Sequence, residues 1–420
     1  MRSARWVLWF SMTCLLALQV YAASPSSEDG RPYGDLPIKV VNPSNLPPGD
    51  IPAVRTPLGI PDDYKPWIVQ LKNRELLIVA FDQEKIPLPS GNRFSERAVF
   101  WRSKDGGRTW GPREERKDLP GREFSLNRMP DGTLLMPCML LADDIANQDR
   151  HHYSMLYRSA NEGKTWTRER IGPEGFPPRG ETVSDWSIIE APDSAKPGRR
   201  MIMMGVSIQN GGRRASDYAY LWRSWNNGKT WDKSLIPDTA NWYDVDGFFS
   251  QSVTYCTRVG KLLHTTRVDA TGPHWRIPGA ELKQQSGDNG DRTMLWDSTN
   301  GGLTWRRHRG NGVFGTYGEM YPRFLRLRDD RLLLTFTVRS NPTDGYPLGL
   351  RAVFSQNDGE TWNFGHDRLI ISYVNEGASG GGFGNTIQLA DEMLVSVYSY
   401  RGKDGKTHVE AVRWSVPSNK

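Results

Sequence analysis

One eight-residue phrase occurs five times in this 420-residue chain and constrains its fold more than any other feature. Each copy reads Ser-x-(Asp/Asn)-x-Gly-x-Thr-Trp. The copies are SKDGGRTW (103–110), SANEGKTW (159–166), SWNNGKTW (224–231), STNGGLTW (298–305) and SQNDGETW (355–362). Successive copies begin 56, 65, 74 and 57 residues apart, enough for about four short strands and their turns. The repeat therefore predicts one propeller blade per copy.

A constant strand pattern surrounds the phrase. An apolar run ends near each Ser, and two further runs joined by a turn lie upstream, as WIVQL (67–71) and ELLIVAF (75–81) do in the first unit. If the strands of a unit are lettered A to D, the phrase is the C–D turn. A sixth unit without the phrase follows at NTIQLA, EMLVSVYS and HVEAVRWSV. The sequence thus predicts an all-β, six-bladed β-propeller over residues 61–420.

The residue types of the phrase suit a hairpin turn. An Asp or Asn at the third place accepts hydrogen bonds from turn amides, and Gly at the fifth place takes a positive φ without steric cost. The Trp offers a large ring to bury between neighbouring sheets. Only Asp105 keeps a carboxylate at the third place, so the phrase predicts a folding element and not a calcium loop.

The N-terminus has the layout of a secretory signal peptide. Arg2 and Arg5 precede an apolar run at 6–20, and Val20-Tyr21-Ala22 offers small residues for cleavage. The run is short for a membrane span. We therefore expect residues 1–22 to be removed and the mature protein to be secreted or periplasmic.

The rest of the composition excludes several classes of protein. Removal of the leader lowers the formal net charge from +6 to +4, and this positive charge is too small to indicate a nucleic-acid-binding surface. Cys138 and Cys256 lie in different units and predict buried free thiols, not a disulfide scaffold. Residues 23–60, rich in Pro, Ser, Gly and Asp, predict an irregular wrap with one strand at 38–41. We expect a monomer without metal, cofactor or membrane span.

The phrase resembles the Asp-box, or BNR, repeat of the sialidase (neuraminidase) superfamily, over about residues 61–416. The resemblance implies a six-bladed propeller and, less directly, a glycosidase, because Asp boxes also occur in propellers without that activity. Sialidases hold the substrate carboxylate with three arginines. They use an Asp as acid/base and a Tyr nucleophile that a Glu activates.

Strand order predicts where the chemistry lies. In an antiparallel blade the starts of A, the ends of B and the starts of C share one face, and the phrases lie on the other. The first face of this chain is rich in carboxylates and arginines. Arginine forks bind carboxylate, sulfate or phosphate groups, and paired carboxylates serve glycoside hydrolysis. The combination predicts an acidic sugar as the ligand.

The resemblance assigns candidate roles on that face. Glu96 stands where the acid/base residue would precede strand C of the first unit. The activating carboxylate is Asp246, with Arg267 as its neighbour, or Glu319, with Arg339. The further residues expected to bind substrate are Arg323, Lys65, Asp82, Arg122 and Asp185.

Two positions depart from the family pattern. Tyr64-Lys65-Pro66 stands where an Arg-Ile-Pro motif would open the first strand, so Lys65 is the nearest cation. Phe383 stands where the nucleophilic Tyr would open the last unit, and a phenyl ring is not a nucleophile. Tyr398, at the end of the next strand, is the substitute candidate, with Tyr400 beside it.

The sequence as a whole predicts an exported, sialidase-like hydrolase that acts on the end of a glycan, on a sialic-acid-like or uronate sugar. Two alternatives remain open at this point. One is a glycan-binding propeller without catalysis. The other is a different glycosidase or a lyase on the same scaffold, which would explain the missing Tyr. A carboxylate pair within roughly 5–10 Å across the pocket would favour a glycosidase.

Overall fold

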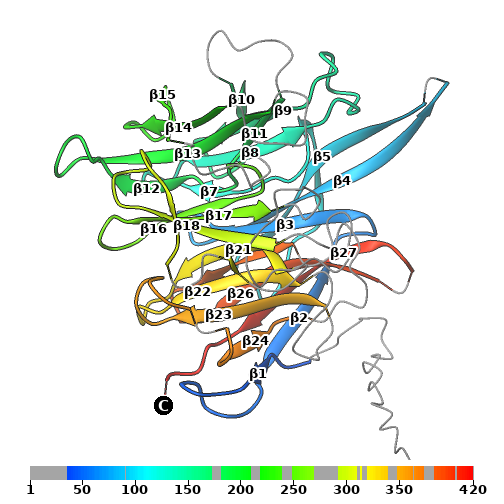
Figure 1. The fold of residues 1–420 in the computed structure, drawn as a ribbon. Helices are drawn as coiled ribbons and strands as arrows, with labels where there is room; N and C mark the ends of the chain where they lie inside the picture. The colour runs from blue at the N-terminus through cyan, green and yellow to red at the C-terminus, as the bar shows by residue number, and fades with distance from the viewer. Residues whose placement is uncertain are drawn as a thin grey trace, which may run out of the picture.

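The structure, a computed structural model, is all-β and forms a six-bladed propeller (Figure 1). It describes residues 36–89, 91–172, 181–209, 218–238, 248–268, 292–309, 313–314, 319–338, 348–362, 364–372, 383–402 and 404–419. Every named element in these ranges is a strand, and each of the six sheets is antiparallel. The predicted fold class is therefore confirmed.

The first three blades follow one another along the chain. Blade 1 contains β3 (Asp63–Gln70), β4 (Leu76–Leu88), β5 (Gly91–Ser103) and β6 (Glu114–Pro120). Blade 2 contains β7 (Asn127–Arg128), β8 (Leu134–Leu140), β9 (Tyr153–Ser159) and β10 (Thr167–Arg170). Blade 3 contains β11 (Glu181–Ser184), β12 (Ile189–Pro192), β13 (Arg200–Gln209), β14 (Tyr218–Ser224) and β15 (Asp232–Leu235).

The last three blades complete the ring. Blade 4 contains β16 (Val253–Cys256), β17 (Leu262–Val268), β18 (Arg292–Ser298), β19 (Arg306–Arg307) and β20 (Val313–Phe314). Blade 5 contains β21 (Glu319–Arg326), β22 (Leu332–Val338), β23 (Gly349–Ser355), β24 (Arg368–Ile370) and β1 (Lys39–Val41). Blade 6 contains β25 (Gly384–Gln388), β26 (Leu394–Arg401), β27 (Thr407–Trp414) and β2 (Ala53–Leu58).

The N-terminal segment closes the ring, which corrects the expectation of an irregular wrap that ends at residue 60. Strand β2 pairs with β27 from Ala53↔Trp414 to Leu58↔Val409 and is the outer strand of blade 6. Strand β1 adds a fifth strand to blade 5 by pairing with β24. The propeller therefore begins before residue 61. Pairing of the first strands with the last blades ties both ends of the described chain into the fold.

The five phrases form the C–D turns, as predicted, and the same hydrogen bonds recur in each. The Gly amide donates to the Ser hydroxyl at 2.8–2.9 Å, and the Thr amide donates to the Asp or Asn side chain at 2.9–3.0 Å. The Gly φ angles lie between +75° and +86°, where a side chain is disfavoured. The phrase is thus a self-contained turn.

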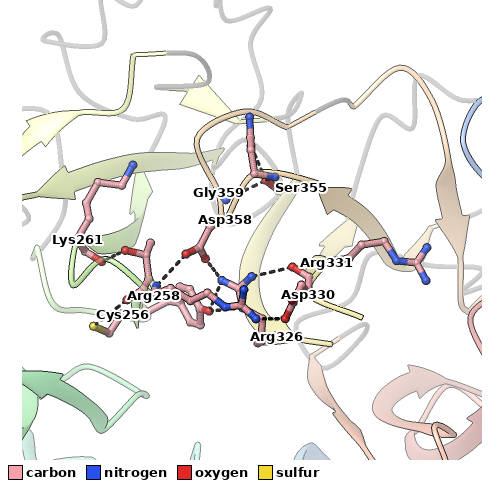
Figure 2. Close-up of polar contacts among 12 residues, drawn as sticks. Cys256, Arg258, Lys261, Arg326, Asp330, Arg331, Ser355, Asp358 and Gly359 are labelled. Carbon is pink, nitrogen blue, oxygen red and sulfur yellow. Dashed lines mark hydrogen bonds and ion pairs between the residues drawn. The ribbon is translucent and has the colours of Figure 1, made fainter. Parts of the chain in front are cut away.

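Each turn also contacts the preceding blade. A Cβ on Gly163 of blade 2 would lie 3.1 Å from Leu77 of blade 1, and one on Gly228 of blade 3 would lie 2.8 Å from Leu135 of blade 2. Further ion pairs join blades 4 and 5 on this face (Figure 2). Arg258 of blade 4 contacts Asp330, and its amide donates to Asp358 at 2.8 Å. The turns therefore fix neighbouring blades to one another.

The two cysteines of the described ranges, Cys138 and Cys256, differ from each other in burial. Cys138 is buried, as expected, whereas Cys256 is only half-buried, which corrects part of the prediction. Both are free thiols. Within the described ranges no helix has the length and apolar character that a membrane crossing needs.

Candidate functional site

A cavity of about 360 Å³ opens on the face opposite the repeated turns. We call it the basin. Its lining residues come from the starts of inner strands, the ends of second strands and one start of a third strand, as strand order predicts. They are Tyr64, Lys65, Phe81, Gln83, Arg122, Glu123, Met139, Leu141, His152, Gln251, Arg267 and Tyr321. Blades 1, 2, 4 and 5 all contribute to it.

The backbone of the basin is strained. Lys65, Glu123, Gln251 and Tyr321 have φ angles of +47°, +56°, +49° and +58°, a region that residues other than Gly seldom adopt. The ladders β3–β4 and β21–β22 shift register beside Lys65 and Tyr321. Such strain costs of order 1–3 kcal/mol per residue and concentrates at functional sites. The blades hold these four side chains in orientations that a relaxed strand would not provide.

Glu96 is a buried carboxyl group against the basin wall. It lies on β5, is 2% exposed and pairs in register with Gln83 on β4. Its Oε1 accepts a hydrogen bond from Gln83 and lies 3.5 Å from the Arg122 guanidinium. Its Oε2 is buried and has no hydrogen-bond partner within the described part of the chain. Burial raises the pKa of Glu96 above its usual value, although Arg122 and Gln83 act against the increase.

Glu123 is a second buried carboxyl group, and its pKa is shifted in the opposite direction to that of Glu96. One of its oxygens contacts the Lys65 ammonium, and the other is buried without a partner among the described residues. Burial acts to raise the pKa of Glu123, but the charges of Lys65 and Arg122 outweigh it, so this pKa lies below its usual range. Two carboxyl groups whose environments separate their pKa values are the pattern of an acid and base pair.

Three cations line the basin around these carboxyl groups. Lys65 is matched by Glu123, and its Nζ lies 4.0 Å from the centre of the Phe383 ring. Arg122 reaches Glu96, whose raised pKa favours the neutral acid. Arg267 donates to the neutral amide of Gln251. The positive charge of the two arginines makes the basin suited to an anionic group.

Arg323 lies beneath the basin, in an aromatic floor. Its guanidinium lies 4.7 Å from the Trp67 ring centre and 4.2 Å from that of Trp186. Burial lowers the pKa of Arg323 to about 9. Phe383, placed by the family pattern where a nucleophilic Tyr belongs, is a buried member of the same floor and packs 4.2 Å from Tyr321 between ring centres. Trp186, Tyr321 and Phe383 form one buried cluster with Trp67 packed against it, so rings from blades 1, 3 and 5 meet Phe383 there.

Two of the expected substrate-binding residues make structural contacts instead of lining the basin. Asp185 is fully buried and accepts hydrogen bonds from Thr254 at 2.6 Å and from the Ser187 amide at 3.2 Å. Burial raises the pKa of Asp185 to about 7. Asp82 pairs with Arg97 at 3.1 Å and with a second arginine of blade 1.

The structure does not bring Tyr398 to the basin. Its side chain is 0% exposed between blades 5 and 6, where it donates to Glu410 and accepts from Arg55 at 3.0 Å. A substrate in the basin cannot contact this hydroxyl, so we assign Tyr398 no role in catalysis. Asp246 and Arg339 lie outside the described residues, as does the side chain of Glu319, whose backbone begins β21.

Strand order assigns Gln83, Glu123 and His152 to this face, but sequence reasoning gave them no role in the site and did not name Gln251. Glu123 is one of many charged residues predicted for this face, and only its contact with Lys65, 58 residues away, distinguishes it. His152 is half-buried, which lowers its pKa, and its buried Nε2 has no partner in the described ranges. No set of three or more His, Cys, Asp or Glu in those ranges is arranged to hold a metal ion.

Solved structures support the fold assignment. No family model matches the chain, and no curated protein matches it in sequence. A Dyadobacter fermentans protein of unknown function is similar, with a TM-score of 0.55 and 18% identity over 91% of this chain and 98% of that one. The Hadza microbial sialidase Hz136 is also similar, with a TM-score of 0.57 and 14% identity over 88% of this chain and 70% of that one.

A third similar structure is the GH93 α-L-arabinofuranosidase of Fusarium graminearum in complex with arabinobiose. It gives a TM-score of 0.50 and 14% identity over 89% of this chain and 97% of that one. The chain therefore has the sialidase-like six-bladed propeller fold that glycoside hydrolases of both kinds share.

Proposed function

We propose that the protein is an exported glycoside hydrolase that removes an anionic sugar from the end of a glycan. Glu96 is the general acid and Glu123 is the ionised carboxylate that acts on the sugar. One observation carries this proposal: Glu123 lines a cavity that also presents Arg122 and Arg267, and Glu96, whose pKa is shifted in the opposite direction, is buried against the wall of that cavity beside Arg122.

The chemistry follows from the two protonation states. Glu96 donates its proton to the glycosidic oxygen as the bond to the anomeric carbon breaks, and the leaving group departs as an alcohol. Glu123 either attacks the anomeric carbon or removes a proton from the attacking water. Lys65 holds Glu123 ionised, and Arg122 and Arg267 bind the carboxylate or sulfate of the sugar.

Two observations weigh against the alternatives. Buried carboxyl groups with unpartnered oxygens cost stability, and a purely binding surface has no need of them. The named similar structures include a sialidase and an arabinofuranosidase, both hydrolases, which favours hydrolysis over a lyase reaction. The two arginines in turn favour an anionic substrate over a neutral arabinoside.

The decisive experiment is turnover of a chromogenic panel that contains a sialoside, uronides and a neutral arabinofuranoside. We expect turnover of an anionic member, reduced by about 10²–10⁴-fold in Glu96→Gln and in Glu123→Gln. Glu84→Gln, an exposed carboxylate on the same hairpin as Glu96, is the matched control. Calorimetric binding of an anionic sugar without turnover of any substrate would instead identify a glycan-binding propeller.

Export is tested separately. N-terminal sequencing of the protein recovered outside the expressing cells is expected to begin after Ala22. An uncleaved N-terminus on protein that stays inside the cell would contradict it.

A further inference from the structure

A third buried carboxyl group, Asp144, lies behind Glu96 and outside the basin. It belongs to the loop between β8 and β9 of blade 2 and is 1% exposed. Its Oδ2 accepts the backbone N–H of Glu96 at 3.0 Å, and its Oδ1 accepts the N–H of Ala146 at 2.7 Å. Two amide donors on one carboxyl group favour its ionised form.

The loop that carries Asp144 is fixed to the β4–β5 hairpin, which projects beyond the other blades (Figure 1). The Phe94 amide donates to the backbone carbonyl oxygen of Asp143 at 3.0 Å, and the Ile145 amide donates to the backbone carbonyl oxygen of Phe94 at 2.8 Å. Arg93 donates to the carbonyl oxygens of Asp144 and, at 3.1 Å, Asn147. These contacts join blades 1 and 2 and hold the Asp144 carboxyl group against the strand of Glu96.

We propose that Asp144 is a positioning residue for Glu96: it fixes the backbone that carries the acid, and its negative charge adds to the burial that favours the protonated Glu96 carboxyl group. This inference rests on the proposed function, in which Glu96 is the acid. It adds a buried residue of the β8–β9 loop that does not line the basin.

The other charged groups around Glu96 define what Asp144 contributes. Burial is the largest cause that raises the pKa of Glu96, and the charges of Asp144 and Glu123 add to it. Arg122, with its guanidinium 3.5 Å away, and Gln83 act against these effects. Glu123 belongs to the basin itself. Asp144 is therefore the like charge that can be removed without altering the groups that would touch substrate.

The other titratable groups around Asp144 are Arg93, Arg122 and Cys138, and none of them supplies a negative charge beside Glu96. Burial raises the pKa of Asp144 above its usual value, although the two amide donors and the charges of Arg93 and Arg122 act against the increase. The Cys138 thiol of β8 is buried, which raises its pKa, so it remains neutral beside the two carboxyl groups. The negative charge next to the acid therefore comes from Asp144 and Glu123.

The test compares Asp144→Asn with Asp143→Asn. Asp143 is the adjacent residue of the same loop, and its side chain is 63% exposed, so the control makes the same charge change in solvent. The readout is a ¹³C NMR titration of the glutamate side-chain carboxyl carbons, with the Glu96 signal assigned by its loss in Glu96→Gln. We expect the Glu96 titration midpoint to move to lower pH in Asp144→Asn and to stay unchanged in Asp143→Asn.

Kinetics provide a second readout. In Asp144→Asn the alkaline limb of the kcat/KM profile is expected to move to lower pH by the same amount, while the acid limb keeps its position. If the protein turns over no substrate, the proposed function fails, but the NMR titration still decides the inference. An unchanged Glu96 midpoint in Asp144→Asn would overturn it whether or not the protein is an enzyme.

Folding of the variant is checked by its thermal melting curve. Should Asp144→Asn not fold, Asp144→Ser keeps a hydroxyl acceptor for one amide and removes the same charge.

Discussion

The basin and the joint between blades 5 and 6 both bury charged side chains, but they satisfy them to different degrees. In the joint, Arg55 donates to the Tyr398 hydroxyl at 3.0 Å, to Glu410 at 3.4 Å and to two backbone carbonyl oxygens at 2.7 and 2.8 Å. In the basin, Glu96, Arg122, Glu123 and His152 each keep a buried polar atom without a partner in the described ranges.

The backbone is also strained in the basin and regular in the joint. Four basin residues other than Gly have positive φ angles, whereas Arg55 lies on a regular ladder between β2 and β27. Buried charge that is hydrogen-bonded to several partners joins parts of the fold, whereas the charged groups of the basin lie on or against a cavity that a ligand can enter. The comparison teaches that burial alone does not mark a site, whereas buried charge beside a cavity with strained backbone does.

The largest expected effect separates activity from stability in the basin. Glu96→Gln should lower kcat/KM by about 10²–10⁴-fold because the amide donates no proton to the leaving group. Its free energy of unfolding should stay the same or rise by about 1 kcal/mol, since functional sites are kept at some cost in stability. Urea unfolding and turnover of the same preparation measure both. A parallel loss of activity and stability would remove the distinction between the regions.

The joint should behave in the opposite way. Arg55→Ala leaves Glu410 buried without its cation, which should lower the free energy of unfolding by about 3–5 kcal/mol. The double variant Arg55→Met/Glu410→Leu should recover part of that loss because no charge remains buried. Activity per folded molecule should be unchanged in both. A single variant as stable as the wild-type protein would show that the joint does not stabilise the ring.

A repeated turn gives an intermediate effect. Gly228→Ala places a Cβ 2.8 Å from Leu135 of the preceding blade at a φ of +75°, which should cost about 1–3 kcal/mol. Gly198→Ala, also at positive φ but with no neighbouring atom within 4 Å, isolates the backbone part of that cost. Thermal unfolding of both variants checks the prediction. Equal melting temperatures would mean that the contact between blades contributes nothing.

The last prediction concerns pH, where the effect per pH unit is small. Burial raises the pKa of Asp185 from 3.8 to about 7, so the folded protein binds this proton more tightly than the unfolded chain. The resulting stability is present in full below the unfolded pKa and is lost as pH rises through the folded pKa. Asp185→Asn should remove a slope of at most about 1.4 kcal/mol per pH unit over that window. Identical slopes in urea titrations of both proteins would contradict it.

Much of the architecture could be predicted because its signals are local. The hydrogen bonds of the repeated turns connect residues four apart or fewer, so the phrase contains its own partners and recurs in readable form. Strand β2, which closes the ring, was not predicted. Its sequence, AVRTPL, is followed by no turn phrase, and the strand with which it pairs, β27, lies more than 300 residues later. Only closure of the ring brings those strands together.

The site was predicted less completely. Lys65, Arg122 and Arg267 line one cavity and Glu96 lies against it, on the face that strand order assigns. Asp82, Asp185 and Tyr398 carry equally suitable groups but turn toward other partners. A polar residue near the end of a strand can face the axis, an adjacent blade or solvent. One residue of register decides between them.

The sequence by itself determined the number of blades, the face of the turns and the charged character of the opposite face, because strand periodicity and turn chemistry act within a few residues. Only the tertiary structure decided which glutamate has a raised pKa and which has a lowered one. That difference depends on burial and on charges such as Lys65 and Arg122, brought close by neighbouring blades. A carboxyl group takes its proton affinity from its surroundings in space, and a linear sequence does not contain them.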